Sequence, residues 1–315
     1  MFSVRNLVAI GTIAGLCACT QAPDMSAIDR EHLKQVQRYD IVQALASNDK
    51  VVVAGTQSSA VLVSTDSGKS WSRRTLGPVS MIGMAACPDG SFVGIDFNHK
   101  LWSADAQGAG WKSVLLDKPR TPLAVTCDNK SQWWVVGSGS KIVKSADRGA
   151  NWQVTDFGED AQFTTVQFVD EAYGVAMGEF GLVAITQDGG ATWKKTAKIP
   201  ADFYPYAALF LDRKEGYASG IAGQILHTTD GAITWAKVAN QTNAPLYQLF
   251  LHGGKPYGVG AAGVVARLDG GAFRFMPYPD AAPVFLGAGV SLKAQQAIAI
   301  GGPGGLVRVI STQAN

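Results

Sequence analysis

A turn that contains an aspartate and ends in tryptophan recurs along this chain. The copies are "STDSGKSW" (64–71), "SADAQGAGW" (103–111), "SADRGANW" (145–152), "TQDGGATW" (186–193) and "TTDGAITW" (228–235). Their tryptophans are 40, 41, 41 and 42 residues apart. A constant period of this length, combined with short strands, is typical of a propeller or a solenoid. Because an active site needs its acid only once, evenly spaced copies favour a structural role.

The residues between these turns have the pattern of β-strands. Residues 161–198 contain "FTTVQFV", "AYGVAMG", "GLVAIT" and "TWKKTAK", which are short, rich in β-branched and aromatic residues, and separated by Gly- and Asp-rich turns. Residues 206–231 and 246–271 repeat the arrangement. The third strand of such a unit occurs seven times. We therefore predict an all-β, seven-bladed β-propeller made of four-stranded blades.

The last repeat ends at Asn315, before a fourth strand. An unpaired strand edge invites aggregation, and propellers protect their edges by closing the ring. We expect "KQVQRYDI" (34–41) to supply the missing strand and to close the ring from the N-terminal side.

The turns themselves suggest what each of their residues does. An Asp carboxylate and a Ser or Thr hydroxyl can accept backbone N–H groups, and Gly permits a positive φ. The tryptophan then buries a large apolar area between sheets. We expect structural roles for Asp66, Trp71, Asp105, Trp111, Asp147, Trp152, Asp188, Trp193, Asp230 and Trp235.

The N-terminus has the features of an export signal. Arg5 precedes an apolar run from Leu7 to Leu16, which is too short to span a bilayer. "LCAC" then resembles a bacterial lipoprotein signal, which implies lipidation of Cys19 and, from the following Thr20, the periplasmic side of the outer membrane. We expect a signal peptide (1–18), a polar tether (19–35) and a propeller (36–315). An ordinary secretory signal is the alternative.

Two further cysteines, Cys87 and Cys127, lie 40 residues apart, close to the repeat period. They are expected at similar places in neighbouring repeats, within an oxidising compartment. A disulfide requires the two Cα atoms to come within about 7 Å, and two buried free thiols are the alternative.

The repeats resemble a known family. The turns look like the Asp-box, or bacterial neuraminidase repeat, and "YGVAMGEFGLVAITQDGGATW" (173–193) resembles the photosystem II stability and assembly factor family of plants and cyanobacteria. The resemblance covers about residues 36–315. It implies a seven-bladed propeller without catalysis that binds a membrane protein during assembly. It implies a client in photosynthesis. For a bacterium that does not photosynthesise we expect an envelope protein complex as the client, and we expect the scaffold to be monomeric alone.

The loops on one face of such a propeller are candidates for binding this partner. Those that join blades share a face with the turns between second and third strands, and several contain proline, aromatic residues or arginine. Rigid scaffolds concentrate function in such loops, and aromatic residues and Arg are common interface anchors. The alternative is a solvated rim. The predicted partner-binding residues are Asp96, His99, Arg120, Phe180, Phe203, Tyr204, Tyr206 and Tyr278.

Other functions have weaker support. A net charge of +2 without long charge runs argues against nucleic acid, and four scattered histidines give no metal-ligand spacing. We predict no metal, no cofactor and no enzymatic activity. The rival hypothesis is a glycan-binding or sialidase-like hydrolytic propeller, which needs converging arginines, a Tyr–Glu pair and an acid. The Arg-Ile/Leu-Pro signature of sialidases is missing, and only Arg120 lies in a loop of the expected binding face.

Overall fold

The computed structural model describes residues 24–196, 199 and 203–313. The chain divides into two compact units, one ending at Lys34 and the other beginning at Gln35. The described part of the first unit contains α1 (Ser26–His32). At the start of this helix the Ser26 backbone N–H donates to Asp24 Oδ1 at 2.9 Å. Within the described ranges, no helix is long and apolar enough to cross a membrane.

The second unit is a series of antiparallel meanders. Its described residues form four sheets of four strands, one eight-stranded sheet and one sheet of three strands. The strands are β1 (Val42–Ser47), β2 (Val52–Thr56), β3 (Ala60–Ser64), β4 (Ser72–Thr75), β5 (Met81–Ala86), β6 (Phe92–Asp96), β7 (Lys100–Ala104), β8 (Lys112–Leu115), β9 (Pro122–Cys127), β10 (Trp133–Gly137), β11 (Lys141–Ser145), β12 (Gln153–Asp156), β13 (Phe163–Phe168), β14 (Gly174–Gly178), β15 (Val183–Thr186), β16 (Lys194–Lys195), β17 (Pro205–Phe210), β18 (Gly216–Gly220), β19 (Ile225–Thr228), β20 (Ala236–Asn240), β21 (Leu246–His252), β22 (Lys255–Gly260), β23 (Val265–Asp269), β24 (Ala272–Phe275), β25 (Ala288–Leu292), β26 (Ala297–Gly301) and β27 (Val307–Ser311).

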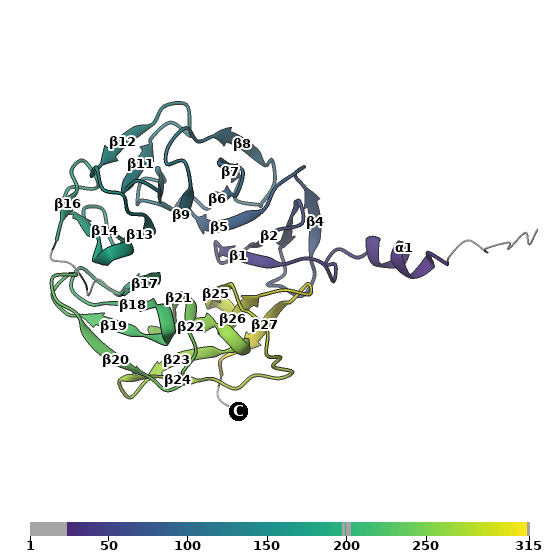
Figure 1. Ribbon diagram of the computed structural model, residues 1–315. Coiled ribbons are helices and arrows are strands. Elements are labelled where there is room, and N and C mark those ends of the chain that lie inside the picture. Colours follow the sequence, from purple (N-terminus) through teal and green to yellow (C-terminus); the bar gives the residue numbers. More distant parts are fainter. Residues whose placement is uncertain (1–23, 197–198, 200–202, 314–315) are drawn as a thin grey trace, which may run out of the picture. The chain divides into compact units, whose positions relative to one another are not determined.

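The eight-stranded sheet consists of two consecutive meanders, β17–β20 and β21–β24, joined by a short parallel pairing of β20 with β24. Single 3-10 turns are η1 (Glu179–Gly181), η2 (Ile221–Gly223), η3 (Ala261–Gly263) and η4 (Lys293–Gln295). Figure 1 shows the sheets of this unit around a central opening, with the first strand of each meander innermost. The predicted all-β, propeller-like architecture is confirmed.

The core of this unit lies between the sheets. The described residues form seven apolar clusters, each shared by two neighbouring meanders. The second strand of each meander is therefore covered on both faces, and a strand such as β10 ("WWVVG") is buried along its whole length. One cluster packs Val42 and Leu45 of β1 against Ala288 and Leu292 of β25. The last sheet thus contacts the first directly.

The predicted closing strand at residues 34–41 is wrong, because these residues form turns and bends while β25, β26 and β27 remain a three-stranded sheet. The physical reason is Asp40, which is fully buried and folds the segment onto itself. Its carboxylate accepts the Gln37 backbone N–H at 2.8 Å and pairs with Arg73 at 2.8 Å. The Asp40 carbonyl accepts the Gly305 N–H at 2.8 Å, so the segment fastens the first sheet to the last without forming a strand.

A disulfide joins Cys87, just after β5, to Cys127 at the end of β9. Their Cα atoms are 5.2 Å apart, within the usual range for a bonded pair. The bond links the ends of the first strands of two neighbouring meanders.

Candidate partner-binding site

The aspartates of the repeated turns form closed hydrogen-bond networks. In one copy, Asp188 Oδ1 accepts the Thr192 N–H and the Thr186 hydroxyl, each at 2.8 Å, and its Oδ2 accepts the Thr192 hydroxyl at 2.6 Å. The Thr186 hydroxyl also accepts the Gly190 N–H at 2.8 Å. Both carboxylate oxygens are therefore used within the turn, which leaves this acid no evident catalytic role.

Bonds of this kind lower the pKa of four turn aspartates. The pKa of Asp66, Asp188 and Asp230 falls to about 2, and that of Asp147 is lowered as well. The largest cause in each turn is the side chain just before the tryptophan, which donates to the carboxylate. The sequence analysis missed these donors, although a Ser, Asn or Thr at that position was the available signal. The donors are Ser70, Asn151, Thr192 and Thr234.

The tryptophans of these turns pack between sheets. Trp193 is 8% exposed, and its ring centroid lies 5.9 Å from those of Trp134 and Phe168. The other four are partly buried against the clusters between their own sheet and the preceding one. They are Trp71, Trp111, Trp152 and Trp235.

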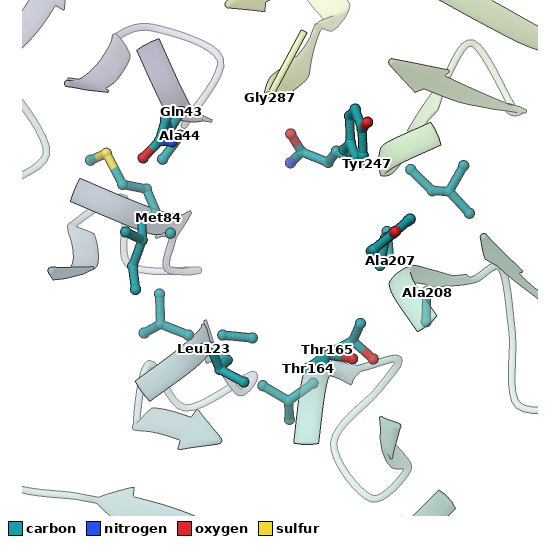
Figure 2. Close-up of a pocket in the computed structure, with 18 of the residues that line it drawn as sticks. Gln43, Ala44, Met84, Leu123, Thr164, Thr165, Ala207, Ala208, Tyr247 and Gly287 are labelled. Atoms are coloured by element: carbon teal, nitrogen blue, oxygen red, sulfur yellow. The ribbon is translucent and has the colours of Figure 1, made fainter. Parts of the chain in front are cut away.

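A central cavity of about 220 Å³ is lined by the first strands of six meanders and by Gly287, which directly precedes β25 of the seventh. These six strands, β1, β5, β9, β13, β17 and β21, contain a shift of register near their start. A bulge inserts one extra residue and redirects its side chain. The six extra residues all line the cavity, and they are Gln43, Ile82, Leu123, Thr164, Tyr206 and Tyr247. Figure 2 shows four of them, Gln43, Leu123, Thr164 and Tyr247, around one opening, with Gly287 in the seventh position.

Glycines at the ends of second strands make room for these bulges. A Cβ atom at Gly178 would lie 1.9 Å from the backbone O of Gln162, and one at Gly260 would lie 1.9 Å from that of Pro245. Such distances are far inside van der Waals contact. The recurring glycine at the end of "GVAMG" and "KPYGVG" is thus explained by close backbone approach at the bulge.

Four aromatic rings form a continuous row at one part of the cavity rim, and we call this row the aromatic arc: Tyr204, Tyr206, Tyr247 and Phe285. Consecutive ring centroids are 5.8, 5.4 and 4.7 Å apart. Tyr206 and Tyr247 also line the central cavity, and Phe285 is 41% exposed. The rings come from three successive meanders, so the fold brings together residues that are up to 81 positions apart in the sequence.

The arc is apolar with polar tips. Burial raises the pKa of Tyr204, and the nearby Glu179 carboxylate raises it further, which keeps the phenol neutral. Within the described part of the chain, no hydrogen bond to the hydroxyls of Tyr204, Tyr206 or Tyr247 is present. Such rings can cover an apolar side chain while their hydroxyl groups bond to a peptide backbone.

Three of the predicted partner-binding residues are buried, and a role for them as exposed anchors is wrong. Asp96 is fully buried and accepts the Trp102 indole N–H at 2.8 Å. Phe203 is 1% exposed and belongs to the cluster between the fourth and fifth meanders. Tyr278 is 8% exposed, and its hydroxyl donates to the Gly263 carbonyl at 2.8 Å.

The other predicted partner-binding residues are accessible to solvent, but they do not all lie in one surface patch. Tyr204 and Tyr206 belong to the arc, and Phe180 is 60% exposed on η1 of the preceding meander. His99 and Arg120 are exposed on the second and third meanders, where Arg120 lines a separate cavity of about 230 Å³.

Tyr247 and Phe285 were missed by the sequence analysis. The signal for Tyr247 was its place in the repeat, because Tyr206 and Tyr247 are the extra residues at the same point of β17 and β21. Phe285 lies in a loop before β25, outside the strand pattern, and no periodic signal marks it.

Comparisons with known proteins give the following relatives. The family model described as "Photosynthesis system II assembly factor YCF48" matches residues 150–266. A curated protein of Synechococcus sp. (strain CC9902), "Photosystem II assembly lipoprotein Ycf48", is 29% identical over 110 residues. This match covers 33% of each chain, so the chain spans about a third of the length of that curated relative.

Solved structures resemble the chain over most of its length. YCF48 from Cyanidioschyzon merolae has a TM-score of 0.71 at 16% identity and covers 88% of this chain and 98% of its own. A structure titled "YCF48 bound to D1 peptide" has a TM-score of 0.69 at 14% identity, with coverage of 89% and 96%. An inactive virginiamycin B lyase from Staphylococcus aureus with quinupristin has a TM-score of 0.72 at 14% identity, with coverage of 89% and 98%. At these identities the likeness shows the fold alone.

Proposed function

We propose that this chain, whose residues 150–266 match the model of the photosystem II assembly factor family, is a non-catalytic scaffold that binds an extended segment of a membrane protein at the aromatic arc. The observation that carries the proposal is the row of four touching rings at the cavity rim. Tyr206 and Tyr247 are held by the first strands of neighbouring meanders, and rings held in this way lose little entropy on binding and bury large areas, as interface hot spots do.

The chemistry of the arc suggests the kind of segment it binds. Apolar or proline side chains would cover the rings of Tyr206 and Tyr247, while backbone groups of the segment would bond to the tyrosine hydroxyls. The solved structure of YCF48 bound to D1 peptide supports a peptide ligand. For this chain the partner would be a subunit of a membrane complex, in photosynthesis or in the cell envelope.

The composition of the central cavity favours this proposal over a glycan hydrolase. Its described lining contains no Asp, Glu, Arg or Lys. A sialidase-like site would need arginines and carboxylates converging there. The turn aspartates are engaged in their own turns, and the lyase with the same fold supports no particular chemistry in this chain.

The finer architecture and the location complete the proposal. The seven meanders and the contact between the first and last sheets support a seven-bladed propeller over residues 36–315. We propose that residues 1–18 are a signal peptide, that Cys19 carries lipid and that 19–35 form a tether on the periplasmic side of the outer membrane. The name of the Synechococcus relative, a lipoprotein, supports lipidation. Cys19 lies outside the described residues.

Photo-crosslinking in cells tests the proposed binding site. Benzoylphenylalanine placed at Phe285, which is 41% exposed in the arc, is expected to form an adduct with one membrane protein that mass spectrometry can identify. The matched control is the same probe at Val154, which is 43% exposed on the outer strand β12 and is expected to give no such adduct. An identical adduct pattern at both positions, or no membrane protein at Phe285, contradicts the proposal.

A further inference from the structure

The last sheet has three described strands, one fewer than each neighbouring meander, so no fourth strand covers its outer edge. The other meanders end in a fourth strand, whereas β27 is the outermost described strand of its own sheet, as Figure 1 shows. The Leu306 carbonyl and the Thr312 N–H both bond toward the side of β26. Because backbone groups alternate in direction along an antiparallel strand, those of Val307, Val309 and Ser311 point to the free edge.

A groove follows this edge. A cavity of about 470 Å³ is lined by Val309 and Ser311 on one side and by Met276 and Pro277, from the segment after β24, on the other. It shares Arg267, Thr312 and Gln313 with a second cavity of about 740 Å³ between the sixth and seventh meanders. We call these two connected cavities the β27 groove.

The larger end of the β27 groove is cationic. Lys255, Arg267 and Lys293 line it, and none of its described lining residues is acidic. The nearest carboxylates hold the lysines only loosely, with Lys255 3.9 Å from Asp269 and Lys293 3.8 Å from Asp49. An anionic group in this end would therefore meet positive charge that is not already strongly neutralised.

The wall of this end is held in place by a buried histidine. His252 is 6% exposed, and its two ring nitrogens lie 2.8 Å from Ser291 Oγ and 2.7 Å from Thr312 Oγ1. Thr312 Oγ1 also lies 2.7 Å from the Gln296 carbonyl oxygen. These bonds fix the end of β27 to the sixth meander and to the residue that precedes β26 in its own meander, so the edge is ordered before a ligand arrives.

We propose that β27 accepts an extended segment of another protein as a fourth, antiparallel strand, with acidic residues at the N-terminal end of that segment lying in the cationic end of the groove. The direction follows from the fold, because the fourth strands of the other meanders run antiparallel to their third strands. β27 runs toward the cationic end, so an antiparallel strand begins there. Strand addition uses backbone bonds for affinity and side chains for selection.

Charge favours such a segment over a second copy of this chain. Two copies paired antiparallel through β27 would place each cationic end beside the Val307 end of the other copy. On β27 itself the charged side chain there is Arg308, which donates to the carbonyls of Pro279 and Asp280 at 2.7 and 2.9 Å, and the strand carries no acidic residue. The β27 groove lies at the outer edge of the propeller, whereas the aromatic arc lies at the central cavity, so the two proposals stand separately.

A synthetic peptide tests this inference. The probe is acetyl-Glu-Glu-Val-Thr-Val-Thr-Val-amide with a fluorophore, and its binding to the full chain is followed by fluorescence anisotropy. We expect saturable binding that weakens at least about tenfold when alternate amides are N-methylated, because edge hydrogen bonds are lost. A peptide with Lys in place of Glu should bind at least about tenfold more weakly.

Protein variants separate backbone pairing from charge. Ser311→Pro removes an outward N–H at an exposed edge position, where proline is tolerated, and should weaken binding at least about tenfold. Ser311→Ala keeps the backbone and should change binding less than about twofold. Arg267→Gln should weaken binding about three- to tenfold and reduce its salt dependence. Tyr247→Ala, in the aromatic arc, should leave it unchanged, which separates this test from that of the proposed function.

The following outcomes overturn the inference. They are the absence of binding at about 1 mM peptide, equal binding of the N-methylated or Lys-containing peptide, and a concentration-dependent dimer that Ser311→Pro abolishes in sedimentation experiments. If Ser311→Pro melts well below Ser311→Ala, the N-methylated peptide alone decides the role of the edge.

Discussion

Replacing Trp193 should show how much the tryptophan of one repeated turn contributes to the stability of the second unit. Its side chain is 8% exposed between the third and fourth meanders, in contact with the rings of Trp134 and Phe168. A buried aromatic side chain removes about 150–250 Å² of surface from water, worth about 4–6 kcal/mol at ~25 cal/mol per Å². Alanine retains part of this area, while the sheets on either side prevent the cavity from collapsing. Trp193→Ala should therefore lower the free energy of unfolding by about 4 kcal/mol.

Urea unfolding, followed both by tryptophan fluorescence and by circular dichroism, measures this effect, and coincidence of the two transitions checks that one process is observed. The control is Trp193→Phe. The buried indole Nε1 has no hydrogen-bond partner in the described part of the chain, so phenylalanine loses size but no bond. We expect a loss of about 1–2 kcal/mol for this control. A loss below about 1 kcal/mol for alanine, or equal losses for both variants, would refute the packing explanation.

Four further predictions follow from the turns, the bulges, the arc and the N-terminus. The pKa of Asp188 is about 2 against an ordinary 3.8, so its ionised form stabilises the fold fully above about pH 4, and this stabilisation is lost as the pH falls through 2. The melting temperature of Asp188→Asn should therefore fall less than that of the wild type over that pH range, which melting curves measure. Gly178→Ala should destabilise by at least about 2 kcal/mol in urea, because its Cβ would overlap a backbone oxygen, and a neutral result would exclude the close approach. Tyr247→Ala should weaken partner capture by at least about 1 kcal/mol with an unchanged melting temperature, whereas Lys194→Ala on an outer strand should not, and the reverse pattern would move the binding site. Labelled fatty acid should mark the wild type but not Cys19→Ala, and an unlabelled wild type would remove the lipid anchor.

The repeating framework could be predicted from the sequence because it obeys local rules. The hydrogen bonds of the turn around Asp188 involve only residues of that turn. The spacing between the tryptophans of successive turns gives the period at which the sheets repeat. Segments such as "FTTVQF" indicate a β-strand by their own composition. These patterns occur several times along the chain, so they can be recognised even where one copy deviates, as with Ala232 in place of glycine.

The candidate site could be predicted only in part, because it depends on contacts between segments that are far apart in the sequence. Phe203 and Tyr204 are adjacent in one loop, yet the first is buried in a cluster between two sheets and the second belongs to the arc. Which ring turns inward depends on the neighbouring meander. Residues 34–41 look like a strand, but the buried pair of Asp40 with Arg73 binds them in turns. Contacts between distant segments decided both outcomes.

The bulges of the first strands separate two tasks that strands normally combine. In a regular strand, a change at one position alters either the packing face or the exposed face, and the alternation ties neighbouring positions together. Five of the six extra residues stand outside this alternation and outside the seven apolar clusters, whereas Ile82 packs against one cluster; the five are Gln43, Leu123, Thr164, Tyr206 and Tyr247. At these five positions side chains can therefore be exchanged one meander at a time while the apolar clusters between the sheets stay intact. A propeller built in this way could acquire a new ligand through a few substitutions in its rim, with its framework and its stability left as they were.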